Sequence, residues 1–141
     1  MMMRVVIDTC VLVSALRSSR GASFRLVNLV GTSAFEIALS VPIVLEYEDA
    51  AKRLGDATAL AHEDIDDVID YLCSVALLQE IHFLWRPLLR DPRDDQVLEL
   101  AVEAGCDLIV THNIRDFAGS DQFGIQVIRP GEFLRRIGGE S

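Results

Sequence analysis

The sequence predicts an α/β protein with three layers, in which helices cover both faces of a parallel sheet. Short apolar strands alternate with amphipathic helices along the chain, and this alternation is typical of a parallel sheet. Several strands are apolar throughout, as expected of strands that are buried on both faces. A chain of 141 residues is long enough for one compact domain and too short for two of ordinary size. We therefore expect residues 1–141 to form a single domain.

The strand and helix patterns follow one another in the order that this fold requires. Strands are expected at residues 4–8, 34–39, 81–84, 107–111 and 126–128, and helices at 11–17, 23–30, 42–54, 62–78, 91–104 and 130–137. Pro42 is acceptable in the first turn of a helix, and Gly55 and Gly105 are typical residues just after a helix end. The helix at 62–78 would bury an apolar stripe and turn a row of acidic side chains toward solvent.

Features of secreted, membrane-spanning and zinc-stabilised proteins are missing from the sequence. The start of the chain has too short an apolar run for a signal peptide, and no later stretch approaches the roughly 18 apolar residues of a membrane helix. A cytoplasmic location without membrane attachment is therefore expected. Cys10, Cys73 and Cys106 are widely spaced and form no CxxC pair, so the sequence indicates neither a disulfide framework nor a structural zinc site.

The formal net charge of −9 is unfavourable for a protein that binds nucleic acid, because affinity for phosphates usually comes from Lys and Arg. Most of the excess lies in one segment, since residues 46–80 contain 10 acidic side chains against Lys52 and Arg53. Twelve of the 13 basic residues are Arg, whose planar forks suit phosphate groups. The charge therefore does not exclude a nucleic-acid substrate, although solvated surface charge explains any single Arg equally well.

Four acidic residues follow strands or begin inward-facing helix stripes. Asp8 ends the first strand, and Asp116 lies in the turn after the strand that ends in Thr111. Both belong at the carboxyl edge of the sheet, where open α/β sheets bind ligands. Glu46 and Asp94 each stand near the start of an apolar helix face that turns toward the protein body. Converging carboxylates are costly without a cation, and a set of oxygen ligands favours Mg²⁺ or Mn²⁺ over Zn²⁺.

Hard divalent ions are suited to phosphoryl transfer, because they can activate water, orient the scissile phosphate and stabilise the oxygens that gain charge. Each carboxylate also has a simpler explanation. Asp8 could cap a helix, Glu46 could be a solvated helix residue, Asp94 could belong to a capping arrangement with Asp91, and Asp116 could cap a turn. The joint placement of the four carboxylates, and no single one of them, indicates a metal site.

At these residues the chain resembles the PIN-domain family, in particular the nuclease toxins of bacterial toxin-antitoxin pairs, often described as VapC-like. The resemblance covers nearly the whole length, and its marks are VVIDTCVLVSAL, SVPIVLEYEDAAKR, RDPRDDQVLELAVEAGCDLIVTHNIRDF and the closing IRPGEFL. It implies a three-layer α/β/α fold with a parallel sheet of about five strands. The implied activity is metal-dependent endonucleolytic cleavage of single-stranded RNA.

The resemblance also implies site residues and partners. The carboxylates that bind Mg²⁺ or Mn²⁺ and carry out catalysis would be Asp8, Glu46, Asp94 and Asp116, and the supporting pocket would contain Thr9, Thr111 and Asn113. A ribonuclease toxin needs a cognate antitoxin, which would cover the cleft. By the same likeness, we expect the chain to form a homodimer.

Two positions depart from the usual pattern of the family. Cys10 stands where members commonly have Asn, and Asn113 stands where many have Asp. The first change would remove a hydrogen bond near the metal, and the second would weaken the binding of a second ion. The sequence therefore leaves open a weakly active enzyme, or one that uses a single ion. Asp95 points about 100° away from Asp94 on a helix, so we assign it a secondary role.

Three functions from other classes compete with this prediction. A haloacid-dehalogenase-like phosphatase would need a second Asp at position 10 and would have to use Lys52, the only lysine. Cys10 and His112 could serve as nucleophile and base if the strands before them are adjacent. A PIN-like binding module would keep the fold and dock a partner without catalysis. Metal-stimulated RNA cleavage distinguishes these classes.

Overall fold

A parallel sheet of five strands forms the centre of the protein, for which the computed structural model describes residues 2–82 and 89–138. The strands are β1 (Met3–Ile7), β2 (Phe35–Leu39), β3 (Leu77–Leu78), β4 (Leu108–Val110) and β5 (Gln126–Ile128). Their order in the sheet is β3-β2-β1-β4-β5, and every neighbouring pair is parallel. The predicted α/β/α fold with five parallel strands is confirmed.

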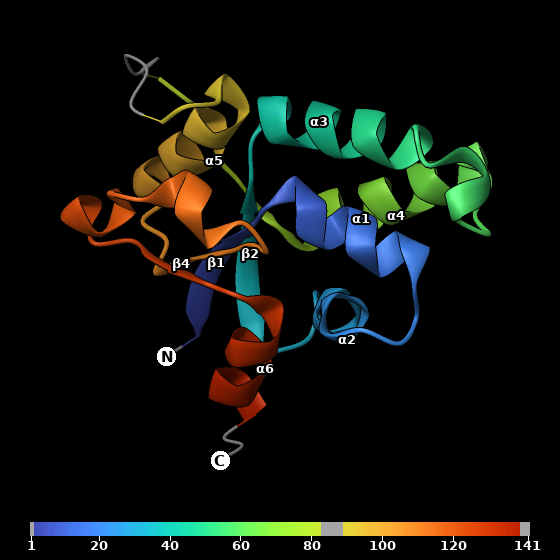
Figure 1. The fold of residues 1–141 in the computed structure, drawn as a ribbon, viewed down its shortest axis with the longest axis horizontal. Coiled ribbons are helices and arrows are strands. Elements are labelled where there is room, and N and C mark those ends of the chain that lie inside the picture. The colour runs from blue at the N-terminus through green and yellow to red at the C-terminus, as the bar shows by residue number, and fades with distance from the viewer. Residues whose placement is uncertain (1, 83–88, 139–141) are drawn as a thin grey trace.

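Helices cover both faces of this sheet (Figure 1). The helices are α1 (Thr9–Arg17), α2 (Ala22–Asn28), α3 (Val41–Lys52), α4 (His62–Val75), α5 (Pro92–Glu103) and α6 (Pro130–Gly138). Figure 1 shows α1 to α4 on one side of the strands and α5 on the other, and α6 packs against α2. This division follows from right-handed crossovers, because the chain moves one way from β1 to β3 and the opposite way from β3 to β5. None of the helices in the two described ranges is long and apolar enough to cross a bilayer.

The central strands are buried because helices lie on both of their faces. Val5, Val6, Ile109 and Val110 have no exposed surface, and Leu108 is almost as well covered. Continuous apolar runs of this kind are typical of central parallel strands, which have no solvent-facing side. The sequence pattern therefore identified β1 and β4 correctly, and these two strands carry the residues of the candidate site at their ends.

Two helices that lead into the candidate site begin at the capping residues that the sequence suggested, although α1 starts at Thr9, two residues before the predicted range. The Asp8 carboxylate caps α1 by accepting a hydrogen bond from the backbone N–H of Thr9 at 2.9 Å. The Asp91 carboxylate caps α5 by accepting one from the backbone N–H of Arg93 at 2.9 Å, with Pro92 in the first turn. Both caps satisfy backbone donors that a helix start leaves free. The capping explanation is thus correct for Asp8, although its carboxylate also accepts hydrogen bonds from other residues.

The third strand lies earlier in the chain than predicted. The helix expected at 62–78 ends at Val75, and the strand is Leu77–Leu78, which pairs with Ala38 and Leu39 of β2. Residues 81 and 82 are not in a strand, and residues 83 and 84 lie outside the described residues. The error arose because a short apolar run has no periodicity that separates a helix end from an edge strand.

A buried tyrosine ties α3 to the end of β1. Tyr47 is almost fully buried, and its hydroxyl donates a short hydrogen bond to the backbone carbonyl of Ile7. Ile7 immediately precedes Asp8, and Tyr47 immediately follows Glu46. One hydrogen bond therefore fixes the helix that carries Glu46 against the strand end that carries Asp8.

We expect Tyr47→Phe to lower the free energy of unfolding by about 1–3 kcal/mol, because it leaves the buried Ile7 carbonyl without its donor. Tyr71→Phe is the matched control. The Tyr71 hydroxyl also donates to a backbone carbonyl, that of Val30 at 3.1 Å, but half of this residue is exposed and water can replace the lost donor. Urea unfolding at equilibrium measures both changes. Equal losses in the two variants would contradict the role assigned to Tyr47.

Candidate functional site

The candidate site lies where the direction of the chain reverses in the sheet. β1 and β4 are neighbours, but the connections after β1 run toward β3, and the connection after β4 runs toward β5. In open α/β sheets ligands bind at such a switch point, outside the carboxyl ends of the two strands. We call this region of the protein, next to Asp8 and Thr111, the crevice. Asp8 directly follows β1 and Thr111 directly follows β4. The Asp8 N–H donates to the carbonyl of Val110 at 2.9 Å, so the two strand ends are joined at this point.

The Asp8 carboxylate is buried and held by three donors. It is 6% exposed and accepts hydrogen bonds from the Thr9 N–H at 2.9 Å and from the Thr111 hydroxyl at 2.7 Å. The Cys10 thiol donates to the same oxygen as Thr111, over 3.4 Å. The Thr111 hydroxyl is in turn held by the backbone N–H of Asn113 at 3.0 Å. These contacts fix the orientation of a negative group in a place where burial alone would make it unfavourable.

Glu46 reaches the same region from α3. The Thr9 hydroxyl donates to its carboxylate at 2.5 Å, so one residue links Asp8 through its backbone and Glu46 through its side chain. Glu46 is half-buried, and the buried face of α3 consists of Ile43, Tyr47 and Ala51. The sequence placed Glu46 on the side of Ile43 and Ala50. The structure shows it at the edge of the buried face, where it can point into the crevice.

Asp94 lies in the first turn of α5 and faces the other carboxylates. Partial burial, followed by the negative charges of Asp8 and Asp116 and then those of Asp91 and Glu46, raises the pKa of Asp94 from 3.8 to about 7. In the described ranges no group forms a hydrogen bond with its carboxylate. The helix stripe behind it is buried as predicted, with Val97 and Leu98 almost without exposed surface. Burial and the nearby acids therefore both favour the protonated form of Asp94.

Asp116 is the outermost of the four predicted carboxylates. It lies in the short 3₁₀ helix Ile114–Phe117, which follows β4, and its side chain is exposed. Its charge acts on Asp94, so the turn after β4 faces the start of α5. Asn113, which precedes this 3₁₀ helix, contributes its backbone N–H to Thr111.

The chemistry of this donor set suits a hard cation. All four predicted carboxylates offer oxygen, and burial and neighbouring charges destabilise the Asp94 anion, as expected of a group that a divalent ion would stabilise. Among the residues that the structure describes, however, no three Asp, Glu, His or Cys side chains are close enough together to hold one ion. The structure thus brings the four acids into electrostatic reach of one another without gathering them into a single coordination shell.

The environment of Cys10 does not support a Cys-His pair. Burial, and then the charge of Asp8, raises the pKa of the Cys10 thiol to about 11, so the thiol stays protonated at neutral pH. The Nε2 atom of His112 is 3.0 Å from the Ser23 hydroxyl and is engaged there. The Cys10 thiol instead donates to the Asp8 carboxylate. From the sequence we expect Cys in place of the family's usual Asn to remove a hydrogen bond near the metal, but this contact supplies one.

The environment of Lys52 argues against the phosphatase alternative. Its ammonium group binds Asp66 at 2.7 Å and Glu48 at 3.0 Å, on the side of α3 that faces α4. A phosphatase of the haloacid-dehalogenase type would need this charge beside Asp8. Lys52 serves the packing of two helices, so the only lysine does not reach the crevice.

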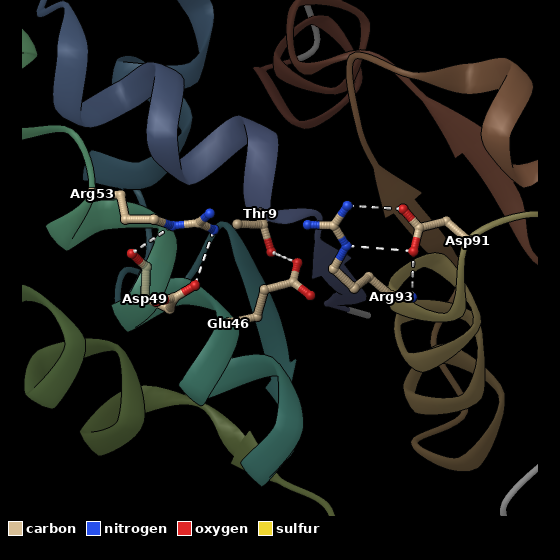
Figure 2. Close-up of polar contacts among 6 residues, drawn as sticks. All are labelled: Thr9, Glu46, Asp49, Arg53, Asp91 and Arg93. Carbon is tan, nitrogen blue, oxygen red and sulfur yellow. Dashed lines mark hydrogen bonds and ion pairs between the residues drawn. The ribbon is translucent and has the colours of Figure 1, made fainter.

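Two arginines, Arg53 and Arg93, flank the Thr9–Glu46 pair in Figure 2. Arg93 belongs to the first turn of α5 and Arg53 follows the last residue of α3. The pKa of Arg93 is raised mainly by its hydrogen bond to Asp91, and next by the charges of Asp91 and Glu46. Arg53 could have been found from spacing, since it lies seven residues after Glu46 and therefore on the same side of the helix.

A hollow lies away from these residues. It has a volume of about 980 Å³ and is lined mainly by α3, the β3 edge and the start of α5, with Val41, Leu45 and Leu78 among its apolar walls. None of the seven predicted site residues lines it. Asp95 does, and its carboxylate accepts a hydrogen bond from the backbone N–H of Leu89 at 3.0 Å. Asp95 thus faces away from the crevice, as its helical position indicates.

Comparison with known families gives a match over most of the chain. The family model for the PIN domain matches residues 4–115, which include every predicted site residue except Asp116. Comparison with curated proteins gives no match. The matched range begins in β1 and ends in the turn after β4, so it contains both strand ends that border the crevice.

The raised pKa of Asp94 predicts a stability that depends on pH. The folded protein binds a proton at Asp94 more tightly than the unfolded chain does, so wild-type protein should lose stability as the pH rises from about 4 to about 7. Asp94→Asn removes this titration. We expect the variant to be more stable than wild type at about pH 7.5 in EDTA, with a smaller difference at about pH 4.5.

Urea unfolding at the two pH values measures this difference. Asp67→Asn is a suitable control because Asp67 is exposed on the outer face of α4. A stability difference between wild type and Asp94→Asn that stayed constant with pH would contradict the electrostatic origin assigned here.

Proposed function

This chain belongs to the PIN-domain family, and on that premise we propose that it is an endoribonuclease that cleaves single-stranded RNA with the help of Mg²⁺ or Mn²⁺. PIN domains are generally nucleases. The observation that carries the proposal is the position of Asp94, a half-buried carboxylate whose pKa is raised by burial and by the charges of Asp8, Asp116 and Glu46. Acids arranged in this way repel one another unless a cation or proton is present.

Each residue of the crevice would have its own role in binding the ion. Asp8 is the rigid member, since three donors hold it in place, and Glu46 is oriented by Thr9. Asp94 and Asp116 would complete the set of oxygen ligands for the divalent ion. When bound, such an ion supplies activation of water and neutralisation of charge on the phosphate oxygens. Thr111 acts through Asp8, because its hydroxyl binds the carboxylate and fixes its direction.

Cleavage of a mixed-sequence single-stranded RNA tests the proposal. Wild-type protein should cleave with Mg²⁺ or Mn²⁺ and stop when EDTA is added. Asp8→Asn and Asp94→Asn should each lower kcat/KM by about 100-fold or more, because each removes a charged oxygen ligand. Asp67→Asn, on the exposed face of α4, should cleave like wild type.

The result separates the enzyme from its alternatives. Folded wild-type protein that cleaves no RNA with any divalent ion would favour the PIN-like binding module. Cleavage that persists in EDTA, or in both Asp variants, would reject the metal-dependent mechanism. Release of phosphate from a small phosphomonoester without RNA cleavage would instead favour the phosphatase.

We further propose that the enzyme is the toxin of a toxin-antitoxin pair. The sequence motifs quoted above support this role, because they resemble VapC-like toxins in particular. The proposed substrate would be RNA of the host cytoplasm, where cell fractionation should find the protein. A cognate antitoxin would restrain the activity by covering the crevice.

Expression of the chain alone should stop bacterial growth, because uncontrolled cleavage of RNA depletes translation. Expression of Asp8→Asn at the same level should leave growth unchanged, and the gene beside this one should encode a protein that restores growth when expressed together with wild type. Normal growth with active wild-type enzyme would reject the toxin role and leave the nuclease proposal intact.

We also propose a homodimer, in line with the family resemblance. A symmetric pair would place two crevices in one assembly and lengthen the path along which RNA can bind. Light scattering should then give twice the chain mass of 15.6 kDa at micromolar protein. A mass of one chain under these conditions would refute the dimer.

A further inference from the structure

Arg53 and Arg93 lie on either side of the Glu46 carboxylate. Figure 2 shows the two guanidinium groups approaching the Thr9–Glu46 pair from opposite sides, one from α3 and one from α5. Glu46 and Asp94 act on Arg93 electrostatically, which places its charge at the edge of the crevice. Arg53 is two helical turns from Glu46 on the same face of α3, about 10 Å along the helix axis. The positive groups therefore border the acidic crevice without filling it.

Each arginine is held by an aspartate of its own segment. Arg93 donates through Nε and Nη2 to Asp91, at 3.4 and 3.1 Å. Arg53 donates through Nε to the backbone carbonyl of Asp49 at 3.4 Å, and its Nη2 atom is 3.0 Å from the Asp49 carboxylate. In both cases Nη1 has no partner among the described residues, and Figure 2 shows the Nη1 atom of Arg93 turned toward the Thr9–Glu46 pair. Each side chain is thus positioned and still has donors to offer.

These pairs are poorly explained as stabilising salt bridges. The side chains of Arg53 and Arg93 are both 65% exposed, and their partners are partly or largely exposed too. Ion pairs in such positions contribute little to folding. Arg136 shows the contrasting case, because its Nη1 binds Gln126 at 2.9 Å and its Nη2 binds Glu132 at 3.3 Å. Both terminal nitrogens of Arg136 are satisfied within the protein.

Resting on the proposed function, we propose that Arg53 and Arg93 form a two-point clamp for the sugar-phosphate backbone of single-stranded RNA, with one phosphate bound on each side of the crevice. Arginine forks bind phosphate oxygens through paired charge-assisted hydrogen bonds. The clamp would hold the strand across Glu46 and offset the repulsion between RNA and a chain of net charge −9. Contacts to the backbone carry no base information, so the clamp fixes position and leaves sequence preference to other residues.

RNA binding measured without catalysis tests the clamp directly. A fluorescent single-stranded oligoribonucleotide is titrated with protein in EDTA at several salt concentrations, and anisotropy gives the Kd. Arg53→Gln and Arg93→Gln should each raise Kd by about tenfold. Each should also reduce the slope of log K against log salt by about 0.7, because one phosphate contact is lost.

Matched variants separate the clamp from a general effect of charge or folding. Arg136→Gln makes the same change of net charge away from the crevice, so its Kd and salt slope should equal those of wild type. Arg93→Lys keeps the charge and loses the fork, so it should retain the salt slope with an intermediate Kd. Urea unfolding of each variant shows that the fold is intact.

Cleavage kinetics supply an independent readout. The two Gln variants should raise KM about as much as Kd while kcat changes less than about twofold, because the clamp binds the strand on both sides of the reacting group. An unchanged Kd and salt slope in the Arg53→Gln/Arg93→Gln double variant would overturn the clamp, even if wild type cleaves RNA. Conversely, lost binding in this variant with no cleavage by wild type would support the clamp and reject the nuclease.

Discussion

The hydrogen bonds to the Asp8 carboxylate determine how the rest of the candidate site is arranged. A buried negative charge needs donors, and here they come from the start of α1 and the end of β4. Thr9 supplies one donor through its backbone and turns its hydroxyl to Glu46. Thr111 supplies another and is itself held by Asn113. The same bonds therefore join the ends of β1 and β4 beside the crevice, and they orient the side chains of Asp8 and Glu46.

Outside this network, helix packing decides where the remaining groups lie. Tyr47 fastens α3 to the carbonyl of Ile7, so the helix that carries Glu46 cannot shift without breaking a buried hydrogen bond. On the opposite side, the cap formed by Asp91 starts α5 and leaves Asp94 in the first turn, facing the crevice. Capping residues in the local sequence therefore determine where each helix starts, and contacts between distant residues determine where the helix lies in the fold.

The arrangement of charge is a compromise between folding and binding. Four acids face one crevice, and burial together with their negative charges raises the pKa of Asp94. Arg93 at the border attracts the charges of Glu46 and Asp94, although the chain as a whole is strongly acidic. Strained electrostatics of this kind are typical of functional sites, because a well-satisfied surface has no affinity left for a ligand.

The sequence by itself determined the fold class, the order of the elements and the strand ends that carry Asp8 and Thr111. These features depend on neighbouring residues, through apolar runs, helix periodicity and capping groups. It did not determine the position of β3, because two apolar residues pair with β2 only once the sheet exists. Nor did it reveal the hydrogen bond between Thr9 and Glu46, the raised pKa of Asp94 or the place of Arg53 beside the crevice. Those relations join residues far apart in the chain, and only the packing of α1, α3 and α5 around the sheet brings them together.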